Sequence, residues 1–175
     1  MTKLLKRTIG LAGLAALFAA APAPLSAQIL EAELTVKGLA CPFCAYGLER
    51  KLKKLPAAAQ VTITFKQNLA RVHFDGNESP ELGRFFQVVR DAGFKLEELR
   101  LLVRGRRSDA GGRPCLELPD GKLLPFAPDG AGADLVREAP PGTPVEARAA
   151  VRPVGADGGA PSYLLHIDSF QALAR

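Results

Sequence analysis

The chain has 175 residues, with 23 Lys and Arg against 18 Asp and Glu, for a formal net charge of +5. Residues 1–27 hold three of these cations and no acid, so the remaining chain carries only +2. Aromatic residues make up 6% of the chain and Trp is absent, which argues against the basic, aromatic surfaces that bind nucleic acid. We therefore expect no nucleic-acid partner.

Residues 1–27 have the pattern of a signal peptide. Lys3, Lys6 and Arg7 precede an apolar run over 9–21, and Leu25-Ser26-Ala27 ends on a small residue suited to cleavage. The run is shorter than the roughly 20 apolar residues that span a bilayer, and no Cys follows Ala27 directly to carry a lipid. We expect an exported protein, periplasmic or secreted, without a stable membrane anchor.

The first part of the remaining chain predicts one strand and one helix around a short Cys loop. Polar and apolar residues alternate over 31–36, which indicates a strand. Cys41-Pro42-Phe43-Cys44 follows, and leucines at helical spacing then predict a helix over 45–55 that ends at Pro56. The other face of this helix is basic, which suits either a solvated face or a docking surface for an acidic partner; its cations are Arg50, Lys51, Lys53 and Lys54.

The next segment completes a six-element unit. Alternation over 61–66 and 70–75 predicts a hairpin. Ser79 is expected to cap a second helix with Pro80 at its first position, Gly93 to end it, and a fourth strand to run from Phe94 to Val103. Residues 29–104 therefore predict an α+β, ferredoxin-like βαββαβ domain with one polar sheet face.

Beyond Arg104 the composition changes to short apolar runs between turn residues. We expect a charged, glycine-rich turn over 105–112, then strands over 115–118, 123–126, 145–154 and 163–167. Asp120-Gly121 is typical of a hairpin turn, and residues 133–138 of a short helix. Residues 105–175 are thus expected to form a small, mostly β domain, an OB-like barrel or a sandwich.

Cys41 and Cys44 are the main candidate site residues. A thiolate is both a nucleophile and a soft metal ligand, so two thiols at the start of a helix suit metal binding or dithiol redox chemistry. Two thiolates from one short loop fit a low-coordinate soft ion, whereas structural zinc needs four ligands. The odd number of three Cys excludes a disulfide scaffold, and no pattern for an organic cofactor is present.

Residues 29–104 resemble the heavy-metal-associated domain found in copper chaperones, copper-transporting ATPases and the periplasmic mercury-binding protein. The matching residues are Gly38, Cys41, Cys44, Gly47-Leu48 and Asp91-Ala92-Gly93-Phe94. Three positions depart from the family pattern: Leu39 stands for the usual Met, Ala40 lacks a hydroxyl, and Pro42-Phe43 is bulkier than usual.

The resemblance implies a carrier rather than an enzyme. Cys41 and Cys44 would bind Cu(I), or alternatively Hg(II), and Phe94 would lie beside the metal loop and shield it from water. The partner would be a membrane metal transporter or a periplasmic acceptor protein. The resemblance does not extend to the C-terminal part of the chain.

The alternative is a periplasmic thiol-disulfide oxidoreductase, because Cys-Pro-Phe-Cys is similar to the active-site motif of some thioredoxin-fold enzymes. The hairpin expected directly after the first helix argues against that fold. Cys115 is interpreted as a buried apolar residue, with a third ligand or an intermolecular thiol as alternatives. His73 and His166 are interpreted as sheet-surface residues.

Overall fold

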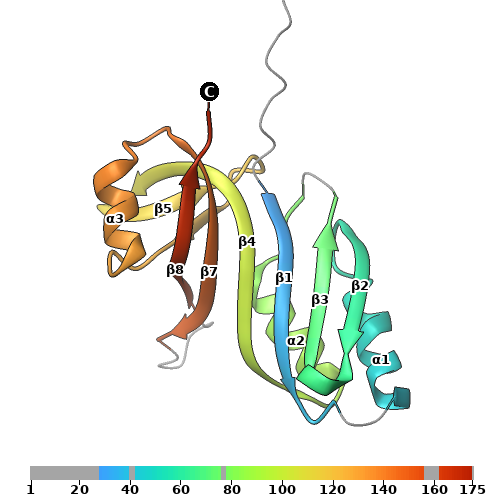
Figure 1. Ribbon diagram of the computed structural model, residues 1–175. Coiled ribbons are helices and arrows are strands. Elements are labelled where there is room, and N and C mark those ends of the chain that lie inside the picture. Colours follow the sequence, from blue (N-terminus) through green and yellow to red (C-terminus); the bar gives the residue numbers. More distant parts are fainter. Residues whose placement is uncertain (1–27, 40–41, 76–77, 156–161, 175) are drawn as a thin grey trace, which may run out of the picture.

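A computed structural model describes residues 28–39, 42–75, 78–155 and 162–174. The expected signal peptide, residues 1–27, lies outside the described residues, as does Cys41. In the described part, eight strands belong to one sheet and three α-helices pack around it (Figure 1). None of the helices in these ranges is long and apolar enough to cross a membrane.

The first half has the expected ferredoxin-like order of elements. These are β1 (Gln28–Lys37), α1 (Pro42–Leu52), β2 (Ala58–Thr64), a 3-10 helix (Phe65–Gln67), β3 (Leu69–Phe74), α2 (Leu82–Asp91) and β4 (Lys95–Ala110). Antiparallel pairing gives the strand order β2-β3-β1-β4, and both helices lie behind this sheet in Figure 1. The α+β, βαββαβ prediction is confirmed for this part.

The sheet face away from the helices is polar, as predicted. Along β1, Leu34 and Val36 are buried, whereas Glu31 and Glu33 alternate with them and are half-buried. Arg71 pairs with both glutamates, and Nδ1 of His73 lies 3.2 Å from Oε2 of Glu31. His73 is therefore a surface residue held by a cross-strand carboxylate.

Strand β4 continues through most of the segment predicted to be a turn. Residues 95–104 pair with β1, residues 100–106 with β7 and residues 106–110 with β5. Gly105 is required inside the strand because a Cβ there would lie 3.0 Å from the carbonyl oxygen of Glu117, and Arg107 is buried. The turn prediction is wrong for Gly105–Ala110, because pairing with β7 up to Arg106 and with β5 from Arg106 onward overrides the turn preference of glycine and charged residues. Within the predicted turn, Gly111-Gly112, both at positive φ, form the turn itself.

The second half consists of β5 (Arg113–Glu117), β6 (Leu123–Pro125), α3 (Ala131–Glu138), β7 (Pro144–Val154) and β8 (Ser162–Ala172). Strand β5 pairs with β4 and β6, and β7 pairs with β4 and β8. A parallel bridge between Phe126 and Leu165 joins the end of β6 to β8. The pairing therefore runs in a closed order, β4-β5-β6-β8-β7 and back to β4.

The residues before α2 link the two halves, and here the predicted helix cap is wrong. Helix α2 begins at Leu82, with Glu81 as its N-cap residue. Ser79 is buried, and its Oγ accepts a hydrogen bond from the backbone N–H of Ile29 at 3.3 Å. The Ser79 hydroxyl thus accepts from a backbone N–H at the start of β1 and does not cap the helix.

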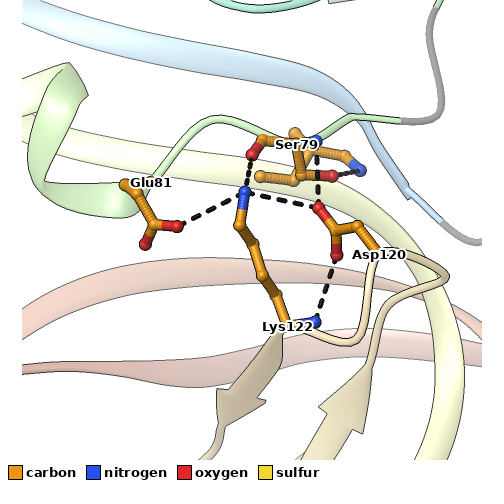
Figure 2. A network of polar contacts seen from close by, with 5 residues as sticks. Ser79, Glu81, Asp120 and Lys122 are labelled. Carbon is orange, nitrogen blue, oxygen red and sulfur yellow. Dashed lines mark hydrogen bonds and ion pairs between the residues drawn. The ribbon is translucent and has the colours of Figure 1, made fainter.

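A polar network joins this segment to the turn between β5 and β6 (Figure 2). Backbone N–H groups of Ser79 and Lys122 donate to the Asp120 carboxylate at 3.3 and 3.1 Å. The Lys122 ammonium donates to the Ser79 carbonyl and lies 3.3 Å from carboxylate oxygens of both Asp120 and Glu81. The polar groups of this cluster thus form hydrogen bonds or ion pairs with one another, which a partly buried polar cluster needs in order to be stable.

Apolar packing supports the same junction. The rings of Phe86 on α2 and Tyr163 on β8 are stacked, with centroids 5.1 Å apart. Gly83 lets the helix approach, because a Cβ there would lie 3.3 Å from the Tyr163 hydroxyl. Buried residues of both halves belong to one continuous hydrophobic core.

We expect Asp120→Asn to destabilise the fold by about 1–2 kcal/mol at pH 7, since it weakens partly buried, charge-assisted hydrogen bonds. Burial raises the pKa of the Asp120 carboxyl, but the hydrogen bonds from Lys122 and Ser79 outweigh burial and leave this pKa below its ordinary value. A carboxyl with a lowered folded-state pKa stabilises the fold above its unfolded pKa and loses that contribution as the pH falls.

Urea unfolding between pH 3 and pH 7 measures this effect. The stability difference between wild type and Asp120→Asn should be largest near neutrality and shrink below about pH 4. Glu97→Gln, which changes an exposed acid on β4, serves as the control and should change stability by less than about 0.5 kcal/mol. A difference that stays constant over this pH range would contradict the role given to the carboxylate.

Candidate metal site

The segment after β1 is fixed by one glycine and one buried leucine. Gly38 has a φ of +93°, a left-handed conformation that favours glycine. Leu39 has no exposed surface and belongs to the hydrophobic core. Its burial anchors the start of the Cys loop, as expected for a packing residue at this position.

Cys44 lies in the first turn of α1 and is exposed. Pro42 begins this helix, where the missing N–H of proline has no cost. The free N–H groups of a first helical turn and the helix dipole favour a negative charge nearby, which suits a thiolate. Cys41 lies outside the described residues, so the pairing of Cys41 with Cys44 stays a prediction.

Phe94, between α2 and β4, lies near the glycine that precedes the Cys loop. Helix α2 ends at Asp91, and Gly93 has a φ of +84°, as the predicted helix end requires. The Phe94 ring is partly buried, and its Cδ1 would lie 3.9 Å from a Cβ built on Gly38. The structure therefore places Phe94 beside the segment that leads into the Cys loop.

The surface around Cys44 combines aromatic and basic side chains. Phe43 is 90% exposed and Tyr46 is 61% exposed. The Arg50 guanidinium lies 5.9 Å from the centroid of the Tyr46 ring, within the range of a cation–π contact. Of the predicted basic run, only Lys53 has an ion pair among the described residues, with Glu49 at 2.6 Å.

The remaining candidate residues do not join Cys44. Cys115 is 2% exposed, and burial raises the pKa of its thiol; its strand β5 lies at the opposite end of the molecule from α1 (Figure 1). His166 lies on β8, with Nδ1 3.5 Å from a carboxylate oxygen of Asp129. Across the described ranges, no three His, Cys, Asp or Glu residues gather into a possible metal site.

Sequence reasoning missed one feature of this end of the sheet. Lys37 and Lys95 are direct cross-strand partners at the ends of β1 and β4. The pairing register of two strands 58 positions apart has no local sequence signal, so the two lysines could not be brought together from the sequence.

Comparison with known proteins supports the resemblance of the first half. A segment of 68 residues, 38% of the chain, is 34% identical to the copper-transporting ATPase HMA4 of Oryza sativa subsp. japonica. The match covers only 7% of that ATPase. No family model matches the chain.

Among solved structures, the yeast copper transporter domain Ccc2a is 24% identical, over 39% of this chain and 92% of that domain, with a TM-score of 0.35. Oxidized MerP from Ralstonia metallidurans CH34 is 24% identical, over 38% of this chain and 92% of MerP, with a TM-score of 0.34. Over 38% of its length, the chain is similar to part of a copper-transporting ATPase, in agreement with the resemblance that its sequence motifs predicted.

Proposed function

We propose that this protein captures a thiophilic metal ion through Cys41 and Cys44 and passes it to a membrane metal transporter or a periplasmic acceptor protein. Cu(I) is the preferred ion and Hg(II) the alternative. The observation that carries the proposal is the exposed Cys44 thiol in the first turn of α1, inside a ferredoxin-like unit similar to a segment of a copper-transporting ATPase. Residues 1–27 would direct export and be removed.

The chemistry of the site suits transfer rather than permanent binding. Two thiolates match the preference of Cu(I) and Hg(II) for few, soft ligands. An exposed thiol leaves room for a partner thiolate to bond the metal as one bond to this protein breaks, with no change of oxidation state. The partner thiol loses its proton to become this thiolate, and the thiolate released from the metal takes up a proton, so the exchange is balanced. No catalytic turnover is part of this proposal.

The second half is proposed to be an OB-like barrel. Its closed strand order, with α3 between β6 and β7, supports that assignment. The proposed division between residues 29–104 and 105–175 falls inside β4, so the two units share a strand. This barrel would hold the metal-binding half rigidly through that strand.

The thiol-disulfide oxidoreductase alternative has less support. A thioredoxin-like site needs a further α/β unit after the helix that carries the dithiol, but α1 leads directly into the β2–β3 hairpin. The feature that favours this alternative is the Cys-Pro-Phe-Cys motif.

We expect Cys41→Ser and Cys44→Ser each to abolish binding of one Cu(I) per chain, because a single thiolate cannot complete the site. The measurement is an anaerobic Cu(I) titration of the reduced chain from Gln28 onward against a competing chelator, with stoichiometry from mass spectrometry. Cys115→Ser, in the other half, is the control and should bind Cu(I) like the wild type. Stoichiometric binding by the Cys41→Ser/Cys44→Ser double variant would refute the proposed ligands.

Phe94→Ala should leave the stoichiometry at one Cu(I) but speed the loss of copper to a chelator by several-fold, because it opens the loop to water and competing ligands. Phe86→Ala is a matched control, since Phe86 is also partly buried but packs against Tyr163. Both variants should lose about 1–3 kcal/mol of stability, so stopped-flow copper transfer separates shielding from packing. Equal transfer rates in the two variants would contradict the shielding role of Phe94.

A further inference from the structure

Two like charges face each other at the end of the sheet that carries the Cys loop. Lys37 is the last residue of β1, and its direct cross-strand partner is Lys95, the first residue of β4. Directly opposite residues of an antiparallel pair have Cα atoms about 4.5–5.5 Å apart, and like charges in such a pair repel. Both lysines are exposed, and neither forms an ion pair within the described residues.

The turn between β2 and β3 adds another lysine and an aromatic ring to this end. The backbone N–H of Val36 donates to the Asn68 carbonyl at 2.8 Å, which brings the 3-10 helix beside the end of β1. The end of the sheet at which β1 ends and β3 and β4 begin lies at the bottom of Figure 1. The exposed residues at the ends of these strands, in the turn before β3 and at the start of α1 are called the loop-end patch: Lys37, Phe43, Phe65, Lys66 and Lys95.

The cations of the sheet face form ion pairs, whereas the lysines of the loop-end patch form none among the described residues. On the sheet, Arg100 lies 2.9 Å from Glu98, and Arg104 lies 2.7 Å from Glu146. Exposed acids also occur near the patch in sequence, at Asp91 and Glu97, but neither pairs with a patch lysine among the described residues. The three lysines are therefore available to an external anion.

The aromatic residues of the patch are unusually open for their size. Phe43 is 90% exposed and Phe65 is 44% exposed. Phe43 lies in the first turn of α1 and Phe65 in the 3-10 helix between β2 and β3, so the two exposed rings belong to separate segments. Rings projecting beside lysines are typical of surfaces that enter the interfacial layer of a membrane.

We propose that the loop-end patch docks on the surface of an anionic phospholipid bilayer, an inference that rests on the proposed transfer of metal to a membrane transporter. The aromatic rings enter the headgroup layer, while the lysines bind anionic headgroups and keep their alkyl stems against the lipid. A docked protein presents Cys44, which directly follows Phe43, at the membrane surface where a transporter takes up its ion.

Co-sedimentation with lipid vesicles tests this proposal. The reduced chain from Gln28 onward contains every described element and lacks the apolar run of 9–21, which could itself enter lipid. We expect it to bind vesicles of 30% phosphatidylglycerol and 70% phosphatidylcholine, but not pure phosphatidylcholine. Binding should weaken as NaCl is raised from 50 to 500 mM, because salt screens the lysines.

Two variants locate the contact. Lys37→Gln/Lys95→Gln should weaken vesicle binding by about tenfold or more, and Phe43→Ser by about tenfold. The matched controls are Arg113→Gln/Arg152→Gln, which removes two exposed cations of the second half, and Leu123→Ser, which removes an apolar side chain that is 47% exposed. Both controls should bind vesicles like the wild type.

Equal binding to neutral vesicles, an equal loss in the controls or no binding to either vesicle would overturn the proposal. Retention on immobilised polyglutamate without vesicle binding would overturn it in favour of an acidic protein partner. A Cu(I) titration of Lys37→Gln/Lys95→Gln separates the two proposals, because one Cu(I) per chain leaves metal capture standing when vesicle binding fails. Cys44→Ser should conversely lose copper and still bind vesicles.

Discussion

The backbone hydrogen bonds of β4 hold both halves of the protein in one sheet. One edge of this strand pairs with β1 and then with β5, while β7 occupies the other edge over residues 100–106. Figure 1 shows β4 curving from the ferredoxin-like half into the second half. If either half unfolded, backbone N–H and C=O groups of β4 would lose their partners, and β4 is also part of the other half. The stabilities of the two halves are therefore coupled.

This shared strand also gives α2 two roles. The helix covers the ferredoxin-like part of the sheet through Phe85 and Val89, both fully buried, and it contacts the second half through the Phe86–Tyr163 stack. The chain leaving α2 passes Gly93 and places Phe94 near Gly38, which leads into the Cys loop. The second half is thus connected by one helix and one strand to the end of the sheet that leads into the Cys loop.

Local patterns predicted the order of the elements well, because alternation and leucine spacing are properties of short segments. The helix-cap prediction for Ser79 and the turn prediction for Gly105–Ala110 were wrong for the same reason: the residues that these segments contact are distant in sequence. Ser79 satisfies the start of β1, and Gly105 packs against the backbone of β5. At the site, motifs in the sequence identified Gly38, Cys44 and Phe94 as candidate residues. The Lys37–Lys95 pair could not be found in this way, because it depends on a strand register that no local pattern encodes.

The central proposal is metal binding by Cys41 and Cys44 after the end of β1. The most direct test is a two-dimensional amide NMR spectrum of the reduced protein, recorded before and after one equivalent of Cu(I). We expect large shifts only in amides of residues 38–47 and 93–95, with the second half unchanged. Large shifts centred on Cys115 and its neighbouring strands, with the first turn of α1 unaffected, would contradict this proposal.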